Sequence, residues 1–418
     1  MKKLSKVLLN KNFVLVVFIF AVAFFVRFYN FPDRVTFWSE QARSLMVSAD
    51  YLNKPSLLGQ EYFRQDSLNH VIFAGAFFNY SLVPLILISK FDPIKITSFF
   101  ALFNLLTGLA VFVAAKKMFN ERVAVISLFL FLFNDFMVYH SLFIWSYNYL
   151  PFVGVLILYF SWRFRTTKDA IDIFLVGFFC GLGISLQYMF AFFAVAVFIA
   201  NIWKGKHLLK DSLIFAMGIF LANLPLIIFD FRHNFYQTRT LLQYFVDTLK
   251  GKSGQGIAYY YFLPFWPVVA IAAAKLVDRL TKNNYAITAL LTIYFVLNIA
   301  SSKISLSSPT GMPSGITTKD IDNAAKRIAH DAEGGFNVSE VLDFDKKAYV
   351  LRYYLQYVYG KKPLDEASYS NINLLYVLSP KDYNFRNSNV WEVNAGGKYN
   401  TELLSGVGNG YAIYKLTK

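Results

Sequence analysis

Glu40, in the segment FWSEQAR (37–43), is the residue whose type and position most directly suggest chemistry. It follows closely on an apolar stretch, Phe13 to Phe28, and Arg43 comes about one helical turn after it. The dipole of a helix beginning near Glu40 would favour the charged carboxylate, as would Arg43. Because a general base must be deprotonated to act, Glu40 is a candidate base. The alternative is a Glu that only complements the dipole at a helix start.

The composition is that of an integral membrane protein. Of the 418 residues, 56% are hydrophobic, 19% are aromatic and only 16% are charged. The formal net charge is +15, but the basic residues stand in small groups between apolar runs and form no continuous stripe, so nucleic acid is not an expected partner. The single cysteine, Cys180, excludes a disulfide framework and a thiolate zinc site.

Nine apolar runs are long enough, or nearly so, to cross a bilayer, which takes about 20 mostly apolar helical residues. The first follows a basic start, MKKLSKVLLNKN, without a small-x-small cleavage site, so we expect an uncleaved first span. The runs are Phe13–Phe28, Ile96–Ala115, Val123–Phe143, Tyr149–Trp162, Ala170–Leu186, Tyr188–Trp203, Ser212–Phe229, Tyr259–Leu276 and Tyr285–Ala300.

A tenth run, His70 to Ile88, decides the orientation of every later span. If it does not cross, the N-terminus and four loops with at least three basic residues each lie on one side, and the short opposite connections carry none. The positive-inside rule then places the N-terminus in the cytoplasm of a multi-pass plasma-membrane protein. We therefore expect residues 70–89 to form an amphipathic helix along the outer leaflet.

The chain divides into two parts. Residues 1–301 form the membrane domain, with a first outer loop at 29–69, and the Ser/Pro/Gly-rich segment SSKISLSSPTGMPSG begins an extracytoplasmic α/β domain at 302–418. The periodicity of the second part predicts helices in NAAKRIAHDA and YVLRYYLQYVYG, and strands in FNVSEVLDF, INLLYVLS, VWEVNAG and GYAIYKL. The predicted fold class is mainly α: a polytopic helical bundle with a small α/β domain.

In the first outer loop, Ser39 is expected to cap a helix from Glu40 to about Leu52 that lies on the membrane surface. Polar residues gather at the outer ends of the spans, whereas a transporter places them near the midplane, so the pattern favours a site that opens outward. Asp135 is expected to face a wet cavity or to be protonated, and His70 and Asn148 are open to a second interpretation, as an interfacial His and a helix cap. The candidates for substrate contacts are Gln41, His70, Asp135, Asn148 and Gln187.

The order of several loose motifs resembles the membrane-embedded glycosyltransferases of the GT-C fold. The nearest branch is the bacterial relatives of protein O-mannosyltransferases and of lipid A aminoarabinose and galacturonic acid transferases. The resemblance covers about residues 10–300, and its motifs are FFVRFYNFPDR, FWSEQAR, GQEYF followed by NH, FDP, FIWSYNYLP and IFDFRHNF.

The resemblance implies that the acid of an Asp-Glu or Asp-Gln pair in the first outer loop is the catalytic base. Here the pair is Ser39-Glu40 or Glu40-Gln41, depending on the alignment, and in either case Glu40 is the only acid left to fill that role. The loss or exchange of the Asp leaves a weak or inactive enzyme open. Relatives often have a His at the position of Met189, two residues after Gln187. This difference puts in doubt any substrate contact inferred from the family for this loop.

The implied function is inverting transfer of a hexosyl or pentosyl group from a polyprenyl-phosphate donor to a lipid, glycan or protein acceptor at the outer face. Arg232 and His233, with Arg43 next, are the candidates to hold the donor phosphate; the alternative for the first two is an interfacial pair beside Asp230. No cofactor is required, no spacing predicts a metal ligand set, and a role for a metal ion stays open. A lipid-linked substrate transporter or flippase is the second hypothesis, and a degenerate partner-binding member is the third.

Overall fold

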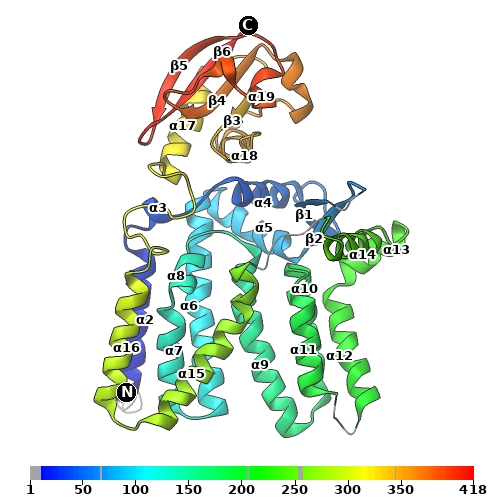
Figure 1. Cartoon of the computed structure of the whole chain (residues 1–418), viewed down its shortest axis with the longest axis vertical. Coiled ribbons are helices and arrows are strands. Elements are labelled where there is room, and N and C mark those ends of the chain that lie inside the picture. Colours follow the sequence, from blue (N-terminus) through cyan, green and yellow to red (C-terminus); the bar gives the residue numbers. More distant parts are fainter. Residues whose placement is uncertain (1–10, 66–67, 204, 206, 253–257, 344) are drawn as a thin grey trace.

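A bundle of long helices carries an α/β domain at one end (Figure 1). The computed structural model describes residues 11–418 except 66–67, 204, 206, 253–257 and 344. The long helices run between the two ends of the bundle, and α2 begins at the end opposite the α/β domain (Figure 1). They are α2 (Lys11–Phe28), α6 (Pro93–Met118), α7 (Glu121–Leu132), α9 (Leu150–Thr167), α10 (Ala170–Leu186), α11 (Phe190–Asn201), α12 (Leu208–Ala222), α15 (Trp266–Leu280) and α16 (Asn284–Ile299).

The mainly helical, polytopic fold class is confirmed. Within the described residues, Pro93–Met118 and Tyr259–Leu280 are each long and apolar enough to cross a membrane. A third candidate is the pair α12 and α13 (Leu224–Arg232), which bends by 75° at its break. Since the other apolar helices are shorter, the nine crossings stay a prediction.

Residues 71–75 form a strand, so the prediction of one helix over 70–89 is wrong in its first part. β2 (Val71–Gly75) pairs antiparallel with β1 (Leu58–Gln65), and α5 (Phe77–Ser89) follows. The β-branched and aromatic residues of VIFAG favour the strand. α5 has 13 residues, about 20 Å at 1.5 Å per residue, too short for a core of about 30 Å. It lies across the end of the bundle (Figure 1).

Helix α4 (Ser39–Asp50) carries Glu40, but its start differs from the prediction. Trp38 is the N-cap residue and Ser39 is already helical, while the Gln41 Oε1 accepts a hydrogen bond from the Trp38 backbone N–H at 3.0 Å. The helix packs against α5 on one side and α18 (Tyr349–Tyr353) on the other. It is therefore covered by the C-terminal domain, contrary to the expected surface position.

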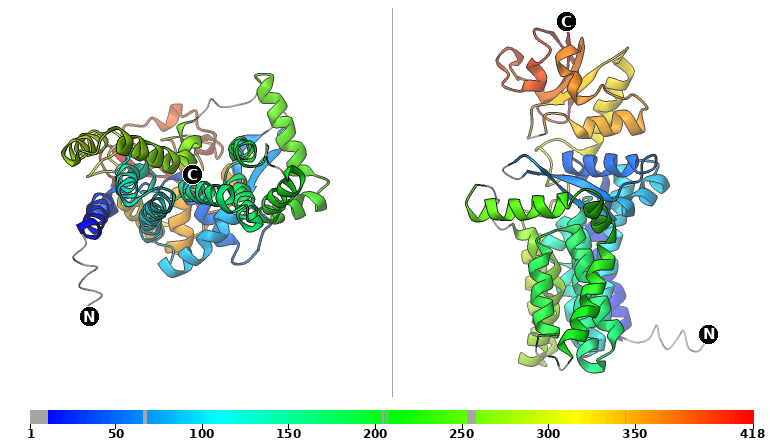
Figure 2. Two further views of the ribbon diagram at one scale, coloured as in Figure 1. Left: turned by 90° about the horizontal axis from the view of Figure 1, so that it is seen from below. Right: turned by 90° about the vertical axis from the view of Figure 1, so that its right-hand side faces the viewer.

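Shorter elements complete the end of the bundle that meets the C-terminal domain. Asn120, Asp169 and Asn283 cap helices at the other end through their side chains, which fixes where the chain turns. The α13–α14 segment projects sideways from the bundle (Figure 2). The short elements are α3 (Phe31–Arg34), α8 (Asp135–His140), η1 (Ser146–Tyr149), α14 (Tyr236–Leu249) and η2 (Tyr259–Phe265).

The C-terminal domain has a four-stranded sheet with the order β3-β4-β6-β5, in which only the β3–β4 pair is parallel. The strand predicted in VWEVNAG is wrong, since Trp391–Asn394 is the short helix α19. Strand β5 was not predicted because its first residues are exposed and polar and give no buried alternation. The elements are α17 (Thr318–Asp331), β3 (Asn337–Glu340), α18 with a π-helical turn (Tyr354–Val358), β4 (Leu374–Pro380), α19, β5 (Asn400–Val407) and β6 (Tyr411–Thr417).

Two buried arginines fix the end of α2 and the start of the first outer loop. The Arg27 Nη2 donates to Asn104 Oδ1 at 2.7 Å and to Leu132 O at 2.9 Å, which ties α2 to α6 and α7. The Arg34 Nε donates to Ser305 O at 2.6 Å, which ties the loop to the segment entering the C-terminal domain. Hydrogen bonds of this kind are what a buried charge requires.

Close packing of α10 on α12 gives the first prediction. A Cβ on Gly177 would lie 2.1 Å from Phe215 O, so the two backbones touch where the small residue allows it. We expect Gly177→Leu to destabilise the bundle by about 1–3 kcal/mol through overpacking. Thermal unfolding in detergent measures this, and Ala196→Leu on the exposed face of α11 is the control. Equal effects of the two substitutions would contradict the packing.

Candidate functional site

A cavity of about 270 Å³ opens where the first outer loop, the bundle and the C-terminal domain meet. Its walls come from five separate parts of the chain, and Gly311 and Asp343 are the lining residues from 302–418. The residues that line it are Thr36, Trp38, Ser39, Glu40, Gln41, Tyr139, Phe143, Trp145, Tyr259, Tyr260, Gly311 and Asp343.

Glu40 lies in this cavity as the second residue of α4, and its side chain is half-buried. The positive end of the helix dipole favours the ionised carboxylate at this position. Its backbone oxygen accepts a hydrogen bond from the Ser44 hydroxyl at 2.8 Å, which belongs to the first turns of the helix. A carboxylate held at a helix start and facing a cavity has the properties required of a base.

Aromatic rings form one continuous wall of the cavity. Ring centroids are 5.1 Å apart for Tyr139 and Phe143, 5.6 Å for Phe143 and Trp145, and 4.9 Å for Trp145 and Tyr260. Tyr259 extends the wall at 5.6 Å from Tyr260. Tyrosine and tryptophan offer an apolar face and a polar tip, a combination suited to a sugar ring with its C–H face and hydroxyl rim.

Asp343 is the second carboxylate of the cavity, and it was not predicted as a site residue. Its Oδ2 accepts from Trp38 Nε1 at 2.5 Å and from the Ser39 hydroxyl at 3.4 Å. Ser39 directly precedes Glu40, and the carboxylate of Asp343 lies against it. Trp38 and Asp343 are 305 positions apart in the chain, so no local motif could have joined them.

Arg43, one turn after Glu40, does not line the cavity. It forms an ion pair with Glu61 of β1, with Arg43 Nη2 3.5 Å from Oε1, and its guanidinium lies 5.9 Å from the ring centre of Tyr349. Only 12% of its side chain is exposed. Arg43 therefore connects α4 to β1 and to the C-terminal domain.

Arg232 and His233 end α13 at the surface, and they do not line the cavity either. The His233 Nδ1 is 2.8 Å from Phe229 O, and its ring stacks on that of Phe229. Asp230, their expected neighbour in an interfacial pair, instead accepts from the backbone N–H of Gln237 at 2.7 Å. Asp230 thus orders the start of α14.

The remaining candidates also lie away from this cavity. Asp135 makes an ion pair with Lys303, at 3.3 Å, and accepts from the Ser301 hydroxyl, and its supporting role stays a prediction. His70 is exposed with its ring 5.7 Å from that of Tyr236, and Gln187 is the buried C-cap residue of α10. Of the predicted site residues, the cavity brings together Glu40 and Gln41.

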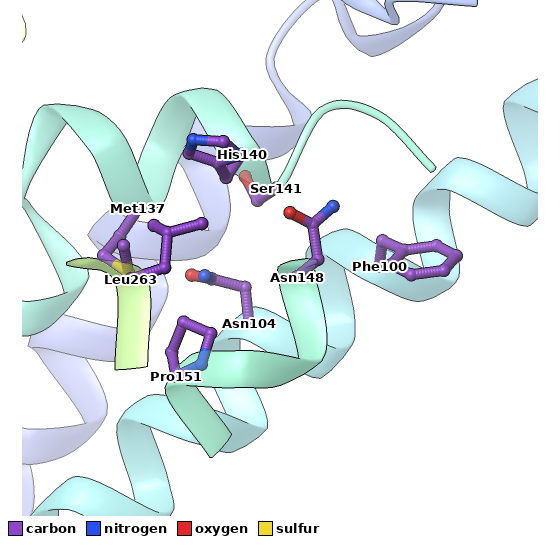
Figure 3. Close-up of a pocket in the computed structure, with 8 residues that line it drawn as sticks. All are labelled: Phe100, Asn104, Met137, His140, Ser141, Asn148, Pro151 and Leu263. Atoms are coloured by element: carbon purple, nitrogen blue, oxygen red, sulfur yellow. The ribbon is translucent and has the colours of Figure 1, made fainter. Parts of the chain in front are cut away.

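Asn148 belongs to a smaller, separate chamber (Figure 3). Its Nδ2 donates to Phe143 O at 2.6 Å, and its Oδ1 faces a space of about 10 Å³ near His140 and Asn104. This volume is about that of one water molecule and cannot hold a sugar. A sugar contact by Asn148 stays a prediction. Among the described residues, no group of three or more His, Cys, Asp and Glu side chains is arranged to hold a metal ion.

The comparisons with known proteins agree with this architecture. Residues 77–229 match the family described as dolichyl-phosphate-mannose-protein mannosyltransferase. ArnT from Cupriavidus metallidurans bound to undecaprenyl phosphate has a TM-score of 0.62 and 12% identity, and the alignment covers 96% of this chain and 97% of that chain. The apo state of the same protein gives a TM-score of 0.58 at 12% identity with the same coverage. No protein of curated function matches by sequence.

At this identity the structural likeness establishes the fold. The chain has the GT-C fold of ArnT, and the resemblance read from the sequence is confirmed. The likeness includes the C-terminal domain, since nearly the whole chain is covered.

Glu340, at the end of β3, lies fully buried behind Asp343. Burial raises the pKa of its carboxyl well above the ordinary value, and the charges of Asp343 and Asp345 raise this pKa further. There is therefore a pH range in which Glu340 is protonated in the folded chain and ionised in the unfolded chain. This contribution to stability is present below pH 4.5 or so, the ordinary carboxyl pKa, and is lost as the pH rises toward the raised pKa.

Glu340→Gln, which keeps the shape and removes the titration, gives the second prediction. We compare the free energy of unfolding of the variant with that of the original chain. This difference is expected to shift in favour of the variant between pH 5 and pH 8, by more than about 1.4 kcal/mol, the free energy of one pKa unit. Thermal unfolding at the two pH values measures the difference. Glu402→Gln, on the exposed part of β5, is the control. A difference that does not change with pH would show that Glu340 is not held protonated.

Proposed function

We propose that the chain is a membrane glycosyltransferase that transfers a sugar from a polyprenyl-phosphate carrier to a hydroxyl of an acceptor. The observation that carries the proposal is Glu40 at the start of α4, inside an aromatic-lined cavity closed by the C-terminal domain. The likeness to ArnT, whose structure was solved with undecaprenyl phosphate, and the match to a mannosyltransferase family support it.

In the proposed reaction Glu40 takes the proton of the acceptor hydroxyl. The oxygen attacks the anomeric carbon from the face opposite the phosphate, the bond from that carbon to the phosphate oxygen breaks, and the configuration inverts. Phosphate is already a good leaving group, since a monoester has its second pKa near ~6. A strong general acid is not needed, and the reaction uses no cofactor. Gln41, which lines the cavity, is the proposed contact to a sugar hydroxyl.

The donor phosphate is proposed to meet cations outside the cavity. Arg232 and His233 lie at the exposed end of α13 beside Phe231, whose side chain is 68% exposed, so this end offers apolar surface and positive charge together. That combination suits the head of a lipid phosphate. Arg43 is the cation nearest to Glu40 along α4. His70 and Gln187 are proposed as contacts to the remainder of the donor or acceptor.

The proposed location is the plasma membrane, with the cavity on the outer side. Basic residues gather around the connections after α6, α9 and α15, which lie at the end of the bundle away from the C-terminal domain (Figure 1). The positive-inside rule assigns that end to the cytoplasm. The acceptor, whether lipid, glycan or protein, then reaches Glu40 from outside.

Glu40→Gln gives the third prediction. Because an amide cannot take the hydroxyl proton, we expect sugar transfer to fall at least about 100-fold while donor binding persists. Mass spectrometry of envelope glycans, in cells without the gene that carry either form, measures the loss. The matched control is Glu121→Gln, at the first residue of α7 at the other end of the bundle. Undiminished transfer by Glu40→Gln would refute the base, and translocation of a lipid-linked substrate without any transferred product would favour the flippase.

Arg232→Ala combined with His233→Ala gives the fourth prediction. Loss of two charge-assisted contacts is expected to weaken binding of the lipid phosphate about tenfold or more. Equilibrium binding of undecaprenyl phosphate to the purified full chain in detergent measures this. Arg279→Ala, exposed near the end of α15 away from the cavity, controls for the loss of charge. If both variants bind as the original chain does, the phosphate is held elsewhere.

A further inference from the structure

The C-terminal domain meets the bundle through the loop that follows β3. Strands β3 and β4 are parallel, and the loop Val341–Asp345 leaves the carboxyl end of β3. This edge of an α/β sheet is where such domains present ligand-binding loops. Here it faces α4, the helix that carries Glu40, and α18 packs on the same helix (Figure 1).

Within this loop, the Asp343 carboxylate is fixed by three neutral donors. Its Oδ1 accepts from the Asp345 backbone N–H at 2.5 Å, and its Oδ2 accepts from Trp38 Nε1 at 2.5 Å and from the Ser39 hydroxyl at 3.4 Å. Trp38 and Ser39 are the two residues directly before Glu40, so these bonds hold the first turn of α4. In the described part of the chain no ion pair of Asp343 is found, and Asp343 lines the cavity together with Glu40.

The domain is also docked through contacts that do not involve Asp343. Phe37 packs edge-on against Tyr353, with centroids 5.2 Å apart, and the Tyr353 hydroxyl donates to Phe91 O at 2.8 Å. The Tyr357 hydroxyl donates to Asp50 Oδ1 at 3.2 Å, at the far end of α4. These contacts hold the interface together, so a carboxylate at the cavity end has a separate role.

We propose that Asp343 is a positioning residue of the Glu40 site. It fixes Trp38 and Ser39, through them the direction of Glu40, and it gives the cavity a second negative charge. The C-terminal domain is then part of the active site, and the part of the acceptor that enters the cavity is neutral or cationic. The role of Asp343 in catalysis rests on the proposed function. Its position and its charge near Glu40 can be tested independently of that function.

The test of geometry and charge uses a thiol at position 40. Cys180, the chain's single cysteine, is buried, so Glu40→Cys in the full chain supplies the one accessible thiol of the described residues. We measure its reaction with a sulfonate-bearing and an ammonium-bearing methanethiosulfonate of similar size. Adding Asp343→Asn is expected to shift the ratio of the two rates toward the anionic reagent by roughly fivefold, the effect of one nearby charge. Tyr357→Phe, which removes a docking bond away from the cavity, should leave the ratio unchanged.

The test of positioning uses transfer itself. In cells without the gene, Asp343→Asn is expected to lower the glycan product about tenfold or more at unchanged binding of undecaprenyl phosphate, and Asp343→Glu to restore part of it. Trp38→Phe removes the same hydrogen bond, so the double variant should lose no more than Asp343→Asn alone. Tyr357→Phe should transfer as the original chain does.

Three results would overturn the inference. They are an unchanged reagent ratio in Asp343→Asn, transfer by Asp343→Asn equal to that of Tyr357→Phe, or a fall in unfolding temperature that accounts for the whole loss. If instead Glu40→Gln keeps full transfer, the proposed function fails, and the reagent ratio still decides whether Asp343 faces position 40.

Discussion

Two guanidinium groups at the end of the first helix, Arg27 and Arg34, set where everything else can lie. Both are buried, and among the described residues neither has an acidic partner within ion-pair distance. Both donate to oxygens: Arg27 to Asn104 and to carbonyls of α2 and α7, and Arg34, through Nε and Nη1, to Ser305 O and to carbonyls near the end of α2. Among the described residues the buried Arg34 Nη2 has no hydrogen-bond partner. Because leaving such a group without partners costs several kcal/mol, the chain must leave α2 at one point and one angle.

The position of Glu40 follows from that fixed exit. Arg34 binds Ser305 in the segment entering the C-terminal domain, so one side chain ties the first outer loop to the domain that will cover it. The Thr318 hydroxyl adds a second tie, donating to Val35 O at 2.8 Å. Trp38 then reaches Asp343, and α4 begins with Glu40 in the cavity. Loop, linker and domain therefore contact one another around the cavity, and each of them contributes to its lining.

Hydropathy was enough to predict the bundle, because long apolar helices are specified locally, residue by residue. Hydropathy failed to predict the local structure where contacts with other parts of the chain determine it. Residues 71–75 looked like part of a helix and became a strand by pairing with β1, and Ser39 looked like the cap that Trp38 provides. Glu40 could be found because family motifs surround it. Asp343 could not, since only its contact with Trp38, far away in the sequence, brings it to the cavity. Arg232 and His233 were grouped with Glu40 because all three were predicted on the same side of the membrane, and that prediction says nothing about the distance between them.

The distribution of charge suggests how the proposed reaction keeps its two substrates apart. No basic residue is among those that line the cavity, which holds two carboxylates, while Arg43, Arg232 and His233 lie outside it. An anionic donor phosphate is repelled from the carboxylates and attracted to the cations, whereas a neutral hydroxyl-bearing acceptor can enter and lie against the aromatic wall. In this arrangement Glu40 acts on the acceptor hydroxyl and not on the phosphate.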